Sequence, residues 1–134
     1  MSTTTFDVRT HDRSELLDIT SQVASAVRDS GIREGAAVVY VPHTTAGLTV
    51  NENADPDVVH DVLAALDKAV PWRQSFYRHS EGNSAAHVKS SIVGCSRTIP
   101  VTGGRMTLGT WQAVFFCEFD GPRSRRVVVT VIGQ

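Results

Sequence analysis

A run of six residues near the C-terminal end, Val-Val-Val-Thr-Val-Ile at positions 127–132, most constrains how this chain folds. Such β-branched runs are typical of strands that are buried in a sheet. Other strand-type patterns follow one another along the chain, and they cover residues 3–9, 16–19, 36–41, 45–51, 97–101 and 111–119. Short turns separate most of them, which favours antiparallel pairing. We therefore expect an α+β fold with an antiparallel, sandwich-like core of seven or eight strands.

Two segments have the amphipathic period of helices. The first follows Thr20, whose side-chain oxygen we expect to cap the helix, and it stops near Gly31. The second begins at Asp55 and Pro56 and continues to about Ala69, because Asp caps helices and Pro suits their first position. Residues 85–93 fit either a short helix or a strand. The stretch at 71–83 is a long polar loop, and long loops in small domains are often functional.

Length and charge narrow the classes of protein. The 134 residues suit one domain, 1–134, and the 41% of apolar residues is ordinary globular usage. The 13 basic and 14 acidic side chains give a net charge of -1, which disfavours nucleic acid as a partner. No apolar run is long enough for a membrane helix, and no signal peptide is visible. Two cysteines outside any CxxC favour a reducing cytoplasm.

Histidines are the first candidates for chemistry. His43 follows a predicted buried strand, His60 lies near the start of the second helix, and His87 closes the polar loop. Their spacing matches no known zinc signature, and each histidine alone would be an ordinary surface residue. Together, near the ends of rigid elements, they are a candidate ligand set for a divalent metal, Zn or Mg, and we expect His43 and His87 to share one cavity.

Further polar residues cluster at element ends. Asn51, Glu52 and Asn53 precede the second helix, where side chains project into a crevice. Glu118 lies in an aromatic-rich strand, so it needs a partner or its pKa must rise. The arginines that follow, Arg123, Arg125 and Arg126, are either a solvated turn with one weak ion pair or guanidinium groups aimed at a phosphate or carboxylate.

Three blocks of sequence carry a family resemblance. They are Val-Pro-His-Thr-Thr-Ala-Gly-Leu-Thr-Val-Asn-Glu-Asn-Ala-Asp-Pro at 41–56, Glu-Gly-Asn at 81–83 with His-Val-Lys-Ser-Ser at 87–91, and Gly-Thr-Trp-Gln at 109–112 with Glu118 and the pair Arg125–Arg126. In this order they resemble the YjbQ-like family, whose members are described as secondary thiamine-phosphate synthases. Cys117 is not a fixed element of that pattern.

The resemblance implies a YjbQ-like α+β fold, a homotrimer and a set of site residues. Carried over by position, these are His43, Asn51, Glu52, His60, His87, Trp111, Glu118 and Arg126. The implied activity is weak coupling of a pyrimidine diphosphate to a thiazole phosphate, with a small phosphorylated molecule as partner. In that reaction Lys89 and Arg126 would stabilise the departing diphosphate, Trp111 would stack on a ring, and His43, Glu52 and Glu118 would be the catalytic groups.

Two alternatives from other classes remain open at this stage. In a metal-dependent hydrolase, His43, His60 and His87 would hold a divalent metal with an open position for water, and Glu118 or Glu52 would act as general base. In a non-catalytic trimer, the same residues would bind a small anionic ligand. Bound metal would distinguish the hydrolase, and release of diphosphate would distinguish the synthase.

Overall fold

The β-branched run forms the centre of strand β8 (Ser124–Gly133), which pairs antiparallel with β1 (Ser2–Arg9) on one side and β3 (Glu34–Tyr40) on the other. In the computed structural model, which describes residues 1–134, the larger sheet has the strand order β1-β8-β3-β5-β6. Its last two strands are β5 (Ser96–Thr102) and β6 (Arg105–Met106). A smaller sheet has the order β2-β7-β4, built from β2 (Glu15–Asp18), β7 (Gln112–Glu118) and β4 (Ala46–Glu52). All pairings are antiparallel, as the sequence predicts.

The two sheets share one apolar core. Val39 and Val129 of the larger sheet and Leu48 and Phe116 of the smaller one are all fully buried in the same cluster. Burying such side chains is the main favourable term in folding. Helix α1 (Thr20–Asp29) closes this core with Val23, Ala26 and Val27. The α+β class and the sandwich-like core expected from the sequence are therefore confirmed.

The start of α1 differs from the expectation in detail. Thr20 is the first helical residue and Ile19 is the N-cap, so the Thr20 hydroxyl does not cap the helix. Instead, Oδ1 of Asp18 accepts the Thr20 N–H at 2.9 Å and the Thr20 hydroxyl at 2.6 Å. Asp18 precedes the N-cap, and a carboxylate oxygen can accept both of these hydrogen bonds. Gly31 follows the helix with a φ of 70°, as a helix stop requires.

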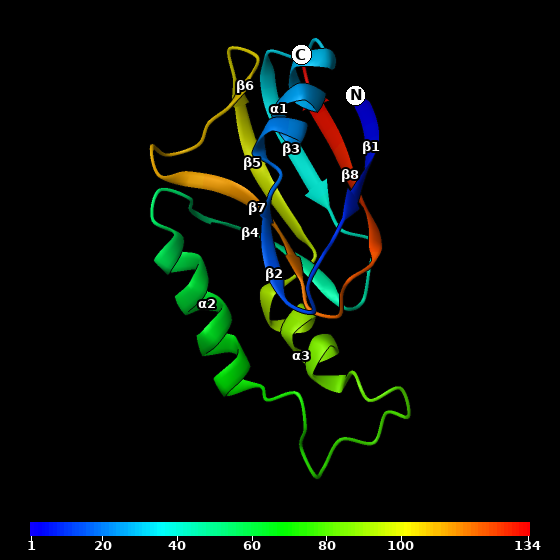
Figure 1. Cartoon of the computed structure of the whole chain (residues 1–134). Coiled ribbons are helices and arrows are strands. Elements are labelled where there is room, and N and C mark those ends of the chain that lie inside the picture. Colours follow the sequence, from blue (N-terminus) through cyan, green and yellow to red (C-terminus); the bar gives the residue numbers. More distant parts are fainter.

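Helix α2 (Pro56–Ala69) begins where predicted, and Oδ1 of Asp55 accepts the Asp57 N–H at 2.9 Å. None of its residues is buried, and it lies at one side of the molecule (Figure 1), where Leu66 packs against the small cluster of Ala86, Cys117 and Phe119. Residues 85–93, ambiguous in sequence, belong to a third helix, α3 (Ser84–Val93). Helix α3 packs against β4, and Lys89 joins it to α2 by an ion pair with Asp67 at 3.0 Å. No helix has the length and apolarity needed to cross a membrane.

Candidate functional site

His43 and His87 lie on one pocket of about 390 Å³ between the start of β4 and helix α3. His43 lies three residues after the end of β3, and His87 is in the first turn of α3. The residues that line the pocket are His43, Thr44, His87, Ser90, Ser91, Gly94 and Cys95. The lining holds two imidazoles and three hydroxyl groups and no carboxylate. Because the lining has no carboxylate, an anion in this pocket would meet no charge repulsion from it.

Close backbone packing fixes the geometry of this pocket. Leu48 of β4 donates its N–H to the Gly94 carbonyl at 3.0 Å, and a side chain at Gly47 would place its Cβ 2.6 Å from the same oxygen. Only glycine allows this approach. The carbonyl of the next residue, Cys95, accepts the Val41 N–H at 2.8 Å. The segments before β4 and after α3 are therefore held at a fixed separation.

His43 is oriented by a backbone hydrogen bond. The Arg126 N–H donates to its Nε2 at 2.9 Å. Partial burial lowers the pKa of His43 below 6.5, and the positive charges of Arg125 and Arg126 lower this pKa further. The ring is therefore neutral at pH 7. Because Nε2 accepts a hydrogen bond, the single ring proton lies on Nδ1.

Behind His43 lies a buried ion pair between Glu118 and Arg125. Nε of Arg125 donates to Oε1 of Glu118 at 2.8 Å, and its Nη2 donates to Oε2 of the same carboxylate. Thr10 donates its hydroxyl to Oε1 at 2.8 Å, and two backbone N–H groups, of Phe119 and Asp120, donate to Oε2. Both oxygens of this fully buried carboxylate are thus occupied. A buried carboxylate with all of its hydrogen bonds made holds the groups around it in place. Removing the Glu118 charge would leave the buried guanidinium of Arg125 without a counter-charge.

The same guanidinium reaches the segment that carries His43. Nη2 of Arg125 also donates to the Thr45 hydroxyl at 2.9 Å, two residues beyond His43. Glu118 lies opposite Ala46 in the pairing of β7 with β4. The ion pair therefore holds the turn from which His43 projects.

On the other wall, the α3 hydroxyls already donate to carbonyl oxygens. The Ser90 hydroxyl donates to the Ala46 carbonyl at 2.6 Å, and the Ser91 hydroxyl donates to the His87 carbonyl at 2.9 Å. The His79 ring from the 71–83 loop packs edge-on against His87, with 5.3 Å between ring centroids. Two of the five histidines thus line the pocket, and a third, His79, packs against one of them.

Comparison with known proteins now identifies the family. A sequence model described as "UPF0047 protein YjbQ-like" matches residues 4–134, nearly the whole chain. This chain belongs to the YjbQ-like UPF0047 family. Its relatives include YugU of Bacillus subtilis, 51% identical over 96% of this chain and 98% of its own, and MJ1081 of Methanocaldococcus jannaschii, 53% identical over 96% and 93%.

Solved structures of the YjbQ-like family have the same fold. A Clostridium acetobutylicum protein described as an orthologue of YugU superposes with a TM-score of 0.94 at 50% identity, covering 96% of this chain and 99% of that one. A YbjQ-like protein of Sulfolobus solfataricus superposes with a TM-score of 0.95 at 33% identity, covering 99% and 97%. The fold expected from the resemblance is therefore shown.

The residues expected from the YjbQ-like pattern do not all meet within one chain. Asn51, Glu52 and Trp111 lie at the far end of β4 from His43, where Glu52 pairs with Gln112. Seven strand residues span roughly 23 Å, at about 3.3 Å each. Trp111 is 64% exposed and lines a separate pocket of about 370 Å³ with Asp18 and Asn53. Oδ1 of Asn51 accepts the N–H of Glu52 at 2.7 Å.

The three-histidine ligand set does not form either. His60 is exposed on α2, and its Nδ1 lies 3.0 Å from Oδ1 of Asp61. No group of three or more His, Cys, Asp or Glu side chains is placed to hold a metal ion. The buried Lys89 is paired with Asp67 and is not part of the pocket lining. The residues of one chain thus do not fit a resident divalent metal, and only the pair His43 and His87 remains of the expected set.

Several residues that line the pocket have no sequence pattern that marks them as functional. Thr44, Ser90, Ser91 and Cys95 line it, and the first three read equally well as ordinary strand or helix residues. The spacing of His79 and His87 could have indicated a pair across the loop. Cys117, by contrast, is buried in the core, and burial raises the pKa of its thiol to about 12, so it is inert.

Proposed function

We propose that this YjbQ-like protein binds a small phosphorylated molecule in the His43–His87 pocket. The single observation that carries the proposal is that two imidazoles and the Thr44 hydroxyl, which has no hydrogen-bond partner in the chain, line one pocket without any carboxylate. Each ring offers an N–H donor when neutral and two when protonated. The absence of a carboxylate from the lining removes the repulsion that a phosphate would otherwise meet.

Positive charge close to His43 supports the same proposal. The Arg126 side chain is exposed and has no ion-pair partner in the chain, while its backbone holds His43. Burial is the main cause that lowers the pKa of His43, and the charges of Arg125 and Arg126 add to it, so both guanidinium groups act on the imidazole. A guanidinium in this position would attract a phosphate and would stabilise negative charge on a departing diphosphate.

The reaction to test is the transfer that the family resemblance implies. The bond between the pyrimidine methylene carbon and the diphosphate oxygen breaks, and the diphosphate leaves with the electron pair. A bond forms from the thiazole nitrogen to that carbon, so no proton has to move at nitrogen. In this scheme neutral His43 donates a hydrogen bond from Nδ1, His87 binds phosphate, and Arg126 stabilises the leaving group.

The hydrolase alternative has less support, because it needs at least three protein ligands around a metal. One chain brings two imidazoles to the pocket, and no acidic cluster lies beside them. We therefore route no step through Zn or Mg. A non-catalytic anion-binding protein would use the same pocket, and it is distinguished by binding without turnover.

Assembly as a homotrimer, with a cytoplasmic location, completes the proposal. Helix α2 has an apolar face that the chain leaves incompletely covered, and α3 exposes Val88 and Ile92 one turn apart. Apolar faces of this kind are usually covered by a partner. Light scattering should give three times the 14.5 kDa chain mass, and the variant Val88→Glu/Ile92→Glu should give a smaller assembly. A monomer mass for the unaltered protein would refute the trimer. Two free thiols agree with a reducing cytoplasm.

The test of function follows diphosphate release and ligand binding in parallel. Unaltered protein is mixed with the pyrimidine diphosphate and the thiazole phosphate, and both diphosphate and thiamine phosphate are measured. His87→Ala and His43→Ala should each lower binding of the thiazole phosphate about tenfold or more, since each removes a hydrogen-bond donor to a charged phosphate oxygen. His60→Ala, an exposed histidine outside the pocket, should leave binding unchanged. Binding with no product supports the non-catalytic alternative, and no binding refutes the proposal.

A further inference from the structure

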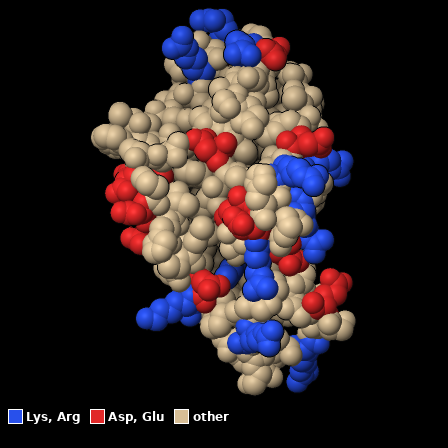
Figure 2. Space-filling view, viewed as in Figure 1, with Lys and Arg blue, Asp and Glu red and all other residues tan.

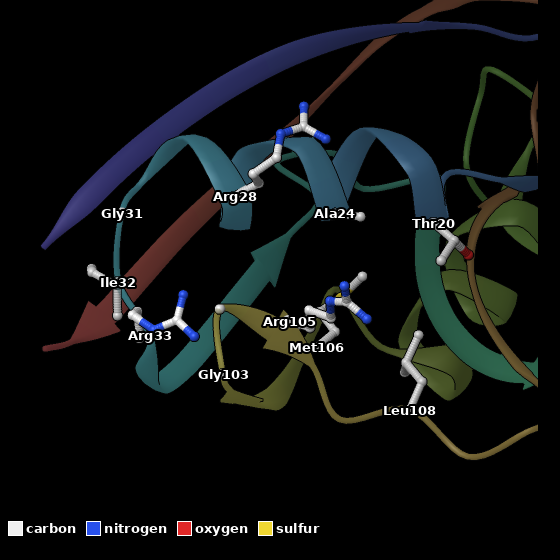
Figure 3. A pocket seen from close by; sticks show the side chains of 11 residues that line it. Thr20, Ala24, Arg28, Gly31, Ile32, Arg33, Gly103, Arg105, Met106 and Leu108 are labelled. Carbon is white, nitrogen blue, oxygen red and sulfur yellow. The ribbon is translucent and has the colours of Figure 1, made fainter.

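A second and larger cavity lies at the opposite end of the five-stranded sheet from His43. Helix α1, the start of β3 and the hairpin between β5 and β6 enclose about 740 Å³, a size typical of small-molecule sites (Figure 3). Strand β3 begins at this cavity and ends three residues before His43. The two cavities are therefore separated by the length of β3, roughly 23 Å at about 3.3 Å per residue. None of the residues proposed above for function lines this second cavity.

One side of the cavity is apolar. Ile32 is buried in the main core, and Met106 and Leu108 pack against that core while also lining the cavity. Their packing fixes the apolar surface in place. An apolar surface of this kind would gain free energy by covering a flat or aromatic group, in proportion to the area buried.

The other side is strongly basic. Three guanidinium groups, those of Arg28, Arg33 and Arg105, line the cavity, and no Asp or Glu lines it. Arg28 has its Nε 3.4 Å from Oδ1 of Asp29, whereas Arg33 and Arg105 have no side-chain partner in the chain. Figure 3 shows the Arg33 and Arg105 side chains on the side of α1 that faces the β5–β6 turn. Figure 2 shows a group of Lys and Arg side chains at the end of the molecule that carries the β5–β6 hairpin in Figure 1, beside one acidic side chain, and further basic side chains at the other end.

The backbone holds the two free arginines close together. The Gly104 N–H, one residue before Arg105, donates to the Arg33 carbonyl at 3.0 Å. Gly103 and Gly104 have φ angles of 60° and 78°, which the tight turn requires. The Gly103 N–H donates to Oε1 of Glu34 at 3.0 Å, so this nearby carboxylate is tied to the turn backbone and does not line the cavity.

The negative end of α1 does not cancel this charge. The last carbonyls of the helix accept hydrogen bonds from within the chain: Ala26 from the Ser30 N–H at 3.1 Å, Val27 from the Ser30 hydroxyl at 2.6 Å, and Arg28 from the Gly31 N–H at 3.2 Å. Satisfied carbonyls present less partial negative charge to a ligand than free ones.

We infer that this cavity is a second ligand site, which takes an organic phosphate with a flat apolar body. Arg33 and Arg105 hold the phosphate oxygens, because the planar fork of a guanidinium matches them and binds in a bidentate manner. Ile32, Met106 and Leu108 cover the apolar body. Arg28 at the rim adds attraction over a longer distance. This site shares no residue with the His43–His87 pocket. The inference therefore does not depend on the function proposed for that pocket.

The probe for this site is 1-naphthyl phosphate, compared with inorganic phosphate and with 1-naphthol. Affinity is measured by calorimetry, and the site is mapped by amide chemical shifts in an ¹⁵N-labelled sample. The variants are Arg33→Gln/Arg105→Gln and, as a control with the same change of charge per residue, Arg73→Gln in the exposed loop before α3. The variants are expected to fold because these side chains are exposed and make no internal hydrogen bond. Circular dichroism checks that each variant is folded.

We expect 1-naphthyl phosphate to bind at least about tenfold more tightly than either control compound, with the Gly31, Gly103 and Gly104 amides shifting. The double variant should lose about tenfold or more in affinity, and Arg73→Gln should change it less than twofold. His87→Ala should leave the shifts of the three glycines unchanged. Absence of these shifts, equal affinity of the double variant and Arg73→Gln, or equally tight binding of 1-naphthol would each overturn the inference.

Discussion

Arg126 donates its backbone N–H to Nε2 of His43 at 2.9 Å, and this bond joins strand β8 to the segment that precedes β4. The donor is part of the main chain, so a side-chain substitution at Arg126 changes the charge near His43 and leaves the hydrogen bond in place. The two contributions of Arg126 to the properties of His43 can therefore be measured separately.

His43 should titrate with a midpoint below 6.5, because partial burial and the charges of Arg125 and Arg126 lower its pKa. Arg126→Gln should raise this midpoint, since it removes one of the two charges. Arg105→Gln, a matched loss of charge at the other end of the sheet, should leave it unchanged. The measurement is an NMR titration of the imidazole signal that disappears in His43→Gln. A midpoint at or above 6.5 in the unaltered protein would contradict this account.

The same pKa has a consequence for stability. In the unfolded chain the reference pKa of histidine is about 6.5, so as the pH falls the unfolded state takes up this proton first. Above about pH 6.5 the protonation of His43 should therefore not change the free energy of unfolding. Below that value it should lower the free energy of unfolding as the pH decreases. In His43→Gln the loss of unfolding free energy between pH 7 and pH 5 should be smaller than in the unaltered protein.

Glu118→Gln should destabilise the fold by about 3–5 kcal/mol, because it leaves the buried guanidinium of Arg125 without its counter-charge. Glu81→Gln, which alters a carboxylate whose side chain is 70% exposed, should change stability by less than about 0.5 kcal/mol. Urea unfolding followed by circular dichroism gives both values. Equal midpoints for the two variants would show that the ion pair contributes little.

Asp55→Ala should cost about 1 kcal/mol, because Oδ1 of Asp55 accepts the Asp57 N–H at the start of α2. Asp55→Asn should retain most of that stability, since the amide oxygen can accept the same hydrogen bond. Chemical denaturation separates the two variants. If Asp55→Asn were as unstable as Asp55→Ala, the charge and not the hydrogen bond would be the main contribution.

One thiol per chain should react with a disulfide reagent in the folded protein. Cys95 is exposed at the rim of the pocket, whereas Cys117 is buried and burial raises its pKa to about 12. Only the thiolate reacts, so Cys117 should stay unmodified until the protein is unfolded. Cys95→Ser should abolish the reaction of the native state. Two equally fast thiols would place Cys117 in contact with solvent.

Local patterns predicted most of this fold from sequence. The β-branched run in β8, the alternation in β1 and the Asp55–Pro56 helix start each depend on neighbouring residues, and each appears as expected. Residues 85–93 were ambiguous because a short apolar segment fits both periods. Thr20 was predicted as a cap because its type suits the position, but Asp18 two residues earlier offers the stronger acceptor.

The site could be predicted only in part, because it depends on register. The position of His43 after a buried strand and of His87 after a polar loop indicated that they could share a cavity, and the structure places both on one pocket. That they bind a ligand stays a prediction. The sequence indicated that Glu118 needs a partner and that arginines follow it, but it left open which arginine pairs with it, because that depends on how β7 and β8 are arranged in space. Likewise, Trp111 lies far from His43 because β4 runs away from it.

A crystal structure of the protein with the thiazole phosphate bound tests the central claim most directly. The account predicts phosphate density between His43 and His87, with the Arg126 guanidinium turned toward it and the Nε2 hydrogen bond of His43 retained. Density for the phosphate at Arg33 and Arg105 alone, with the His43–His87 pocket empty at saturating ligand, would contradict the proposed function.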